Sequence, residues 1–251
     1  MESVAWDEDQ AQRYDVEHSR MDTPTAVRYL SDLAHGGDVL EFGVGTGRLA
    51  IPLASYARQV VGIDSSPQML AVAAREPLPP NLTLVQGDAV AWSSSRRFDL
   101  VLCVFNTLLL MTTQDAQLAV ICNAADHLNP GGSFVIENIH PPLRALEEGE
   151  RISTLQLPGV EIAICTEVFD WKTFHLEQRT LYISDGVSRT RAFSQRLLLP
   201  AEQDLMARLA GLRLIKRMSN WRGTPWRSDP NGPATSNVIS TYQLANDTPH
   251  C

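Results

Sequence analysis

The sequence predicts an α/β protein whose core is a mostly parallel sheet covered by helices on both faces. Three observations lead to this prediction. Between Asp38 and Asn138, short apolar runs alternate with helix-like runs of about 10–15 residues, a rhythm typical of parallel strands joined by crossover helices. A glycine-rich turn follows the first apolar run. After Pro142 the pattern changes to period-two alternation, which favours an antiparallel sheet with one exposed face.

The expected elements follow one another in order along the chain. The second helix has Ser65 or Ser66 as its N-cap, whereas Pro52 fits poorly inside the first helix. Strands are expected at 37–42, 59–64, 81–88, 97–106 and 132–138, with helices at 46–57, 65–76 and 113–128 between them. Further strands are expected at 160–171, 175–184 and 187–199, then a helix at 201–210, a strand at 212–218, a loop at 219–236 and a last strand at 237–244.

Composition and charge exclude several classes of protein. The 251 residues carry 21 basic and 29 acidic side chains, and the net charge of −8 argues against binding to nucleic acid. The longest apolar stretch, Leu100–Met111, is too short to span a membrane, and the acidic N-terminus lacks a signal-peptide core. The four cysteines are scattered without a CxxC pair. We therefore expect a cytoplasmic protein with reduced cysteines, no metal, and no membrane or nucleic-acid partner.

The strongest functional signal is the glycine-rich turn in VLEFGVGTGR, residues 39–48. Ligands of doubly wound sheets bind beyond the carboxyl ends of the strands, where glycine permits close approach. A dinucleotide-binding fingerprint would place its third glycine one residue after Gly47. The Glu41 carboxylate would face a pyrophosphate unfavourably, but it would suit a cation such as an ammonium or a sulfonium. The alternative interpretation is an ordinary glycine-rich turn.

Two further acidic residues stand at the ends of the next two expected strands. Asp64 ends the second strand, and a carboxylate there can accept both hydroxyls of a ribose. Asp88 ends the third strand on the same edge of the sheet, where it would suit the edge of an adenine. Each residue alone fits a helix cap or a turn equally well. Three acids behind a glycine turn favour a nucleoside-like, cationic ligand.

Five stretches of the chain resemble class I S-adenosylmethionine-dependent methyltransferases: LEFGVGTGRLAIPLA, GIDSSPQML, LVQGDAVAW, FDLVLCVFNTLLLM and HLNPGGSFVIE. They cover about residues 38–138 in the order and spacing of that family. The C-terminal part is similar to small-molecule methyltransferases of bacterial secondary metabolism. The resemblance implies a Rossmann-like seven-stranded sheet, completed by 212–218 and 237–244, with an antiparallel β insertion after the fifth strand. It also implies S-adenosylmethionine (SAM) as cofactor and S-adenosylhomocysteine (SAH) as product.

The resemblance assigns cofactor contacts residue by residue. The glycine turn would surround the methionine moiety, and Asp64 with the adjacent Ser65 would hold the ribose. Asp88 would hydrogen-bond the edge of the adenine. The residues implied are Tyr14, Glu41, Gly43, Gly45, Gly47, Asp64, Ser65, Met69, Asp88, Ala89 and Phe105. The corresponding division of the chain is an N-terminal helical lid (1–37), a cofactor-binding core (38–140), a β insertion (141–199) and a C-terminal part completing the sheet (200–251).

Candidate acceptor-side residues come from the N-terminal arm and from two strand ends. Tyr14 and His18 share one face at helical spacing, and the resemblance makes Tyr14 a lid or active-site residue. Tyr14 packing the arm on the core is the alternative. Asn106 follows the fourth strand, where many relatives contact the acceptor, although it also fits a loop cap. His140 follows the fifth strand and is the candidate general base, with a structural histidine as the alternative.

The loop at 219–236 is the last candidate region. Trp221, Arg222 and Trp226 interleave aromatic and cationic side chains, which can line a substrate pocket through stacking and cation–π contacts. A loop that merely covers the end of the sheet is the alternative interpretation.

The sequence therefore predicts an enzyme that transfers a methyl group from SAM to an N or O nucleophile of a small molecule, an intermediate of a bacterial natural product such as an antibiotic. Catalysis of such a transfer is largely alignment, with His140, Tyr14 and Asn106 as the candidate catalytic residues. A methyltransferase-like protein that binds the cofactor for another reaction, such as a cyclisation, is the alternative. The glycine spacing and Glu41 argue against a nicotinamide oxidoreductase. We expect the β insertion to cover the cleft or to form a homodimer contact.

Overall fold

The structure, a computed structural model, describes residues 6–140, 150–158, 160–226 and 236–245. It contains a core sheet and an insertion sheet. The core strands are β1 (Asp38–Phe42), β2 (Gln59–Asp64), β3 (Leu82–Gln86), β4 (Phe98–Cys103), β5 (Leu128–His140), β10 (Leu212–Met218) and β11 (Ser236–Leu244). The insertion strands are β6 (Glu150–Leu155), β7 (Ile162–Asp170), β8 (His175–Ser184) and β9 (Val187–Arg196). The helices are α1 (Glu8–Glu17), α2 (Thr23–Ala34), α3 (Ala50–Leu53), α4 (Pro67–Ala73), α5 (Gln114–Asp126) and α6 (Pro200–Leu209), with a 3₁₀ turn, η1 (Thr107–Leu110).

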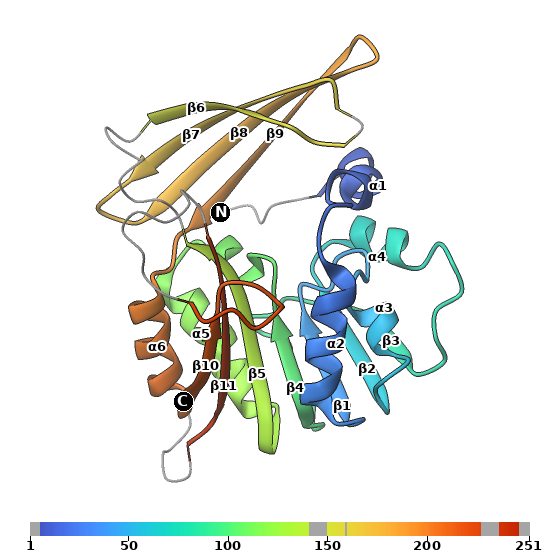
Figure 1. Cartoon of the computed structure of the whole chain (residues 1–251), viewed down its shortest axis with the longest axis vertical. Helices are drawn as coiled ribbons and strands as arrows, with labels where there is room; N and C mark the ends of the chain where they lie inside the picture. Colours follow the sequence, from blue (N-terminus) through green and yellow to red (C-terminus); the bar gives the residue numbers. More distant parts are fainter. Residues whose placement is uncertain (1–5, 141–149, 159, 227–235, 246–251) are drawn as a thin grey trace.

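The core sheet has seven strands in the order β10-β11-β5-β4-β1-β2-β3. Strands β1 to β5 pair in parallel, whereas β11 pairs antiparallel with both β5 and β10. The insertion sheet is antiparallel in the order β6-β7-β8-β9. Figure 1 shows it at one end of the core sheet, the end at which α1 also lies. The predicted fold class, a Rossmann-like seven-stranded sheet with an antiparallel insertion after the fifth strand, is confirmed.

Alternating side chains of the central strands build a core on each face of the sheet. On β4, Leu100 and Leu102 join the cluster that contains Leu30 of α2, while Val101 joins the cluster that contains Ile121 of α5. Strands buried on both faces read as continuous apolar runs, which is why FDLVLC was recognisable as a strand. In the described part of the chain, no helix is long and apolar enough to cross a membrane.

The predicted helix at 46–57 is mostly wrong. Only Ala50–Leu53 is helical, because the preceding turn requires a positive φ of 82° at Gly47 and Pro52 cannot donate a helical N–H. The N-cap prediction for α4 is confirmed for Ser66, whose hydroxyl accepts from Met69 N–H. Thr113 caps α5 in the same way, by accepting from Ala116 N–H.

Three further elements differ from expectation. Strand β5 begins at Leu128, so the segment expected only to end α5 is already part of the sheet. Strand β6 was not predicted at all. Cys103 and Cys165 are free and buried, as expected, but Cys122 is disulfide-bonded, contrary to expectation.

The N-terminal segment contains two helices with different surroundings. Helix α2 buries Ala26, Val27 and Leu30 in the core and contacts β4 and β5. Helix α1 buries only Ala11 and contacts α4. The description of residues 1–37 as a lid therefore suits α1 alone, since α2 is a covering helix of the core sheet.

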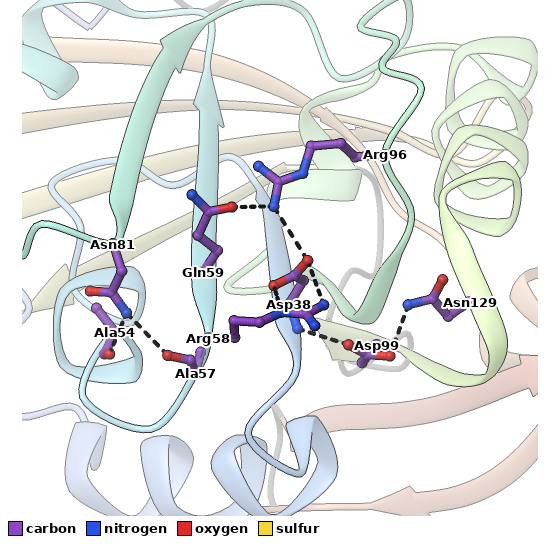
Figure 2. Close-up of polar contacts among 9 residues, drawn as sticks. All are labelled: Asp38, Ala54, Ala57, Arg58, Gln59, Asn81, Arg96, Asp99 and Asn129. Atoms are coloured by element: carbon purple, nitrogen blue, oxygen red, sulfur yellow. Dashed lines mark hydrogen bonds and ion pairs between the residues drawn. The ribbon is translucent and has the colours of Figure 1, made fainter.

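The amino-terminal edge of the core sheet is fixed by a closed set of polar contacts (Figure 2). Asp38 accepts two hydrogen bonds of 2.9 Å from Arg58 and lies 3.3 Å from Arg96, which also donates to Gln59. Asp99 accepts from Asp38 N–H and from the Asn129 amide, both at 2.8 Å. The Arg58 guanidinium beside Asp38 holds the pKa of that carboxyl below its usual value.

Candidate active site

A cavity of about 340 Å³ lies between the carboxyl edge of the core sheet and the insertion sheet. Its lining comes from the glycine turn and the ends of β2 and β3, from the segment after β4, from α1 and from the inner face of the insertion. This volume is within the range of small-molecule binding sites, about 300–1,000 Å³. The cavity is therefore large enough for a ligand, and its two ends have different chemistry.

At the core end, the Asp64 carboxylate is held by the backbone. Gly45 N–H donates to Oδ2 and Ser66 N–H donates to Oδ1, each at 2.8 Å. These bonds join the glycine turn to the start of α4 through one side chain. Burial raises the pKa of Asp64, and the two backbone N–H groups oppose that shift. Asp64 and Ser65 both line the cavity.

The glycine turn leaves no room for side chains. At Gly43, φ is +71°, and a Cβ would lie 2.4 Å from the Thr107 side chain. At Gly45, φ is +56°, and a Cβ would approach Met69 Cε to 3.3 Å. Gly43 and Gly45 line the cavity, whereas Gly47 packs against Ile51 and does not. The first two glycines let a ligand approach the backbone, and the third permits the close packing of the turn.

Glu41 stands behind the glycine turn as a buried carboxyl group. Its side chain is 3% exposed, and its Oε2 atom has no hydrogen-bond partner. Burial raises the pKa of Glu41 to about 8, with Arg48 acting against the shift and Asp64 reinforcing it. The carboxyl lines a recess of about 30 Å³ together with Tyr14 and Gly43. An unpaired buried acceptor of this kind is stabilised by a proton or by a cationic ligand.

The remaining predicted cofactor residues of the core line the same cavity. Met69 is 3% exposed at the start of α4, and Ala89 is 9% exposed after β3. Asp88 is exposed and accepts a hydrogen bond of 2.9 Å from Val90 N–H, so it acts as a turn cap as well as a lining residue. This combination provides an apolar slot with an acceptor at its edge.

The segment after β4 has an unusual backbone. Phe105 and Asn106 have φ values of +53° and +67°, a left-handed conformation that is uncommon for non-glycine residues and is often found near functional sites. Glu137 holds the turn through Phe105 N–H (3.2 Å) and through its carbonyl, to which Asn106 N–H donates (2.9 Å). The Asn106 side-chain oxygen accepts from Ile139 N–H at 2.7 Å. Both turn residues line the cavity, and the Asn106 side chain is also a structural tie.

Helix α1 places an aromatic group over the cavity. Tyr14 and His18 stack with ring centroids 4.4 Å apart, and His18 meets Phe105 edge-on at 5.3 Å. Trp6 meets Tyr14 edge-on at 5.3 Å. The Thr46 hydroxyl donates to Asp15 at 2.6 Å, which ties the helix to the glycine turn. Tyr14 and His18 both line the cavity, as expected from their shared face.

The inner face of the insertion supplies lining residues that the sequence analysis missed. Arg191, Phe193 and Gln195 alternate along β9, so their side chains share one face. In the strand register, Glu167 of β7 is opposite Gln178 of β8, which is in turn opposite Phe193. The alternation was visible in the sequence, but it did not indicate which face would meet the core.

The Arg191 guanidinium is the cationic group of this wall. It lies 4.9 Å from the Trp6 ring centroid and 5.3 Å from that of Phe193, and 3.8 Å from the Glu17 carboxylate. A second ion pair, Arg189 with Asp9 at 3.1 Å, also connects β9 to α1. The helix is therefore held between the glycine turn and the insertion sheet.

Four other predicted residues do not line the cavity. The His140 and Trp226 ring centroids lie 5.9 Å apart, and the Arg217 guanidinium also lies 5.9 Å from the Trp226 ring centroid. Trp221 donates to Glu137 Oε1 at 3.0 Å, and the exposed Arg222 pairs with Asp22 at 3.3 Å. Residues 227–235 of the predicted loop at 219–236 lie outside the described residues. None of these four side chains lines the cavity.

The residues at the core end fit SAM. Glu41 Oε2 is an unpaired buried acceptor for a cationic group, the glycine turn is a cradle that any Cβ would fill, and Asp64 presents a fixed carboxylate to a ribose. Among the described residues, no group of three or more His, Cys, Asp and Glu side chains is placed to hold a metal ion.

Comparisons with known proteins agree with this arrangement. Residues 39–132 match the family described as a methyltransferase domain. A cypemycin N-terminal methyltransferase from a Streptomyces species is 27% identical over 194 residues, which are 76% of this chain and 78% of that protein. The solved CcbJ methyltransferase of Streptomyces caelestis aligns with a TM-score of 0.86 and 28% identity, over 98% of this chain and 100% of that chain.

A third protein, a SAM-bound amino pentose methyltransferase from Micromonospora echinaspora, shares the fold with a TM-score of 0.66 and 19% identity, over 96% of this chain and 99% of that chain. The domain match and the alignment along nearly the whole chain agree with the glycine cradle and the strand-end acids. Together these matches support a class I S-adenosylmethionine-dependent methyltransferase.

Proposed function

We propose that the enzyme methylates an amine nitrogen of a small molecule in bacterial secondary metabolism. The observation that carries this proposal is Glu167, the carboxylate at the acceptor end of the cavity, where Arg191 is the one cation among the described lining residues; Asp64 and Asp88 at the cofactor end make the whole lining net negative. An acidic lining attracts a cationic acceptor and a cationic donor and disfavours anionic ones. An amine, which is a cationic ammonium in solution, suits an acidic lining better than a neutral hydroxyl group does. The charge of the lining therefore favours N over O, the two acceptor atoms that the sequence left open.

The names of the relatives support the same choice. The cypemycin enzyme is named for methylation at an N-terminus, and the Micromonospora enzyme is described as acting on an amino pentose in calicheamicin biosynthesis. Both names denote amines of natural products. The alignment with the CcbJ methyltransferase covers 98% of this chain and therefore includes the insertion sheet, which lines the proposed acceptor end of the cavity.

In this proposal the two ends of the cavity have separate roles. When bound, SAM supplies the methyl group, which leaves its sulfur for the acceptor nitrogen. Asp64 and Ser65 hold the ribose, Met69, Asp88 and Ala89 contact the adenine, and Glu41 behind the glycine turn balances the positive charge. The aromatic residues Tyr14 and Phe105 exclude water from the junction of the two ends, so that nucleophile, methyl group and sulfur are held in line.

A product assay tests the proposed function. The protein is incubated with SAM and a panel of amines: a methyl aminopentoside, a methyl aminohexoside and a peptide with a free N-terminal alanine. We expect SAH to form together with an N-methylated amine identified by fragmentation in the mass spectrometer. The matching hydroxyl compounds, which lack the amine, serve as controls. Methylation of the hydroxyl compounds alone, or conversion of an acceptor without methylation, would reject the proposal, and the latter would favour a cyclisation-type reaction.

We also propose that the outer face of the insertion contacts a second copy of the chain. Ile152, Ile162 and Val168 are 77%, 47% and 50% exposed on the same sheet. Their alternation with the buried Ala163, Cys165 and Phe169 puts them on the face away from the cavity. Sedimentation of the wild type should give a dimer, and Val168→Glu combined with Ile152→Glu should give a monomer. A monomeric wild type would reject this contact.

A further inference from the structure

We infer that His18 of α1, rather than His140, accepts the proton that the acceptor nitrogen loses for methyl transfer. This inference rests on the amine methylation proposed above. Both histidines were candidates from the sequence, one for substrate binding and one for catalysis. Only His18 lines the cavity. Its ring lies at the junction of the two ends, against Phe105 of the turn after β4.

The hydrogen bonding of His18 fixes which ring nitrogen is basic. Nδ1 lies 2.8 Å from the carbonyl oxygen of Tyr14. A carbonyl oxygen can only accept, so Nδ1 must carry the hydrogen, and in the neutral ring the lone pair is then on Nε2. A backbone carbonyl one helical turn earlier is a rigid partner. The imidazole is therefore held in one tautomer by the helix that carries it.

Nε2 is available to a ligand. It forms no hydrogen bond with the described part of the chain. It is also not one of the buried polar atoms that lack a partner, so it is accessible from the cavity. The ring is packed on one side by Tyr14, at 4.4 Å, and edge-on by Phe105, at 5.3 Å. These contacts fix the ring plane and leave the nitrogen edge as its reactive part.

The charged groups around His18 favour the neutral ring. Burial has the largest effect and lowers the pKa of the imidazole, and the nearby Arg191 and Arg48 lower it further. The hydrogen bond to the Tyr14 carbonyl and the Asp15 carboxylate act in the opposite direction, and the net shift is downward. At neutral pH the ring is therefore unprotonated, which is the state required of a proton acceptor.

The proton and electron balance of the step is simple. The acceptor ammonium transfers one proton to Nε2, which makes the imidazolium, and the freed nitrogen lone pair forms the new N–C bond. The C–S bond breaks, and its electron pair leaves with the sulfur of SAH. The product is the methylated ammonium, and the imidazolium returns its proton to solvent. One proton is released for each methyl group transferred.

His140 does not line the cavity, and its ring packs on Trp226. The same set of variants tests both residues. His18→Asn retains a donor near the position of Nδ1 and removes Nε2, whereas His18→Gln places a non-basic amide near the position of Nε2. His140→Asn is the competing variant. His35→Asn, in an exposed turn with a positive φ of 49°, is the matched control.

The first readout is kcat/KM for the amine that the panel identifies, measured from pH 5 to 9 at saturating SAM. Wild type should lose activity below an apparent pKa that is lower than 6.5, the usual value for histidine. Both His18 variants should be about 10²–10⁴-fold slower and should lack this acid limb. Their affinity for SAH should change less than threefold, which shows that the fold and the cofactor site are intact. His35→Asn should behave as wild type.

The result that overturns the inference is a His18→Gln variant that retains the acid limb, or His140→Asn removing that limb while His18→Asn does not. A second readout needs no acceptor and therefore separates failure of this inference from failure of the proposed function. In ¹⁵N-histidine-labelled protein with SAH, the His18 signal, assigned by its loss in His18→Asn, should report hydrogen on Nδ1 and a pKa below 6.5. Hydrogen on Nε2, or a pKa above 7, would overturn the inference even if no amine in the panel were methylated.

Discussion

The two edges of the core sheet differ in how their acidic side chains are hydrogen-bonded. Strand β1 has one acidic residue near each edge. At the amino-terminal edge, Asp38 accepts two hydrogen bonds from Arg58 and its pKa is lowered. At the carboxyl edge, Glu41 is fully buried with one oxygen unpaired and a pKa raised to about 8. They are three positions apart on one strand. Satisfied charges stabilise the fold, whereas unsatisfied charges mark the place prepared for a ligand.

The same contrast extends to neighbouring elements. Asp99, at the amino-terminal edge, is saturated by a backbone N–H and an Asn129 amide. At the carboxyl edge, the segment after β4 holds two non-glycine residues, Phe105 and Asn106, at positive φ. At these positions, the hydrogen-bonded carboxylates lie at the amino-terminal edge, and the unpaired carboxyl and the two positive φ values lie at the edge that borders the cavity. The contrast can be broken by exchanging or removing the charges at either edge.

The largest effect is expected from Asp64. Asp64→Ala removes the carboxylate that we propose to hold the ribose, and loss of a charge-assisted pair of hydrogen bonds costs about 1.5–3 kcal/mol. The affinity for SAH, measured by calorimetry, should fall by about 10- to 100-fold. Asp38→Ala removes an aspartate from the other edge and should leave this affinity within twofold of wild type. Equal losses in the two variants would contradict the assignment.

Removal of α1 should have the next largest effect. The helix is held by the hydrogen bond from Thr46 to Asp15 and by the ion pairs of Asp9 and Glu17 with the two arginines of β9. It buries only Ala11. Deleting residues 1–20 should leave a folded core, because α2 keeps its own packing, and should weaken SAH binding by about tenfold through loss of the Tyr14 and His18 cover. Far-UV circular dichroism checks the fold. Normal kinetics in the truncated protein would mean that the helix has no role at the site.

A smaller effect, on stability rather than binding, is expected at Asp38. Its side chain is 10% exposed, but Arg58 and Arg96 are 69% and 40% exposed, so solvent weakens the pairs and their loss in Asp38→Asn should cost about 1 kcal/mol. A lowered pKa contributes stability above its unfolded value of about 3.8, and this contribution is lost as the pH falls through the folded value. Urea unfolding should therefore give a lower free energy of unfolding for Asp38→Asn than for wild type at pH 7, and this difference should disappear in strong acid. A deficit that persists there would point to packing.

The smallest and most diagnostic change is Glu41→Gln. A raised pKa contributes stability below the unfolded value of 4.5, and that stability is lost as the pH rises towards 8. Glutamine has no charge to bury, so the melting temperature of the variant relative to wild type should increase between pH 5 and 9. The sign is opposite to that of Asp38. A difference in melting temperature between variant and wild type that is independent of pH would mean that Glu41 does not change its protonation in this range.

The same substitution should weaken binding of SAM. A cation favours the ionised form of Glu41, so the affinity of the wild type should rise as the pH rises through about 8, with release of a proton on binding. Glu41→Gln should bind more weakly and without this pH dependence. Calorimetry in two buffers with different enthalpies of ionisation measures the proton count. An identical proton count in the variant would assign the proton to another group.

The core was predictable because its signals are local. Strand β4 is a continuous apolar run and α4 has a serine cap, and both are readable without tertiary context. The cofactor candidates follow from strand ends, which a parallel sheet brings to one edge. The helix expected at 46–57 failed because the φ of Gly47 depends on packing against Ile51, which the sequence does not reveal.

The acceptor end was less predictable because it is built by contacts between distant segments. Arg191 and Gln178 alternate with other residues in a recognisable pattern, but only the docking of the insertion decides which face meets the cavity. His140 was expected just after the fifth strand and is the last residue of β5, yet its ring meets Trp226 of a later loop. His18 was paired with Tyr14 by helical spacing, whereas its tautomer depends on a backbone carbonyl that spacing cannot specify.

The central claim is that the unsatisfied carboxyl edge of the sheet is the SAM site, and a crystal structure of the complex with SAH tests it most directly. The account predicts the ribose hydroxyls on Asp64, the adenine against Met69 and Ala89, and the amino group of the homocysteine on the side of Glu41 Oε2. SAH bound elsewhere, or bound in this cavity with its ribose away from Asp64 and with Glu41 Oε2 still unpaired, would contradict the account.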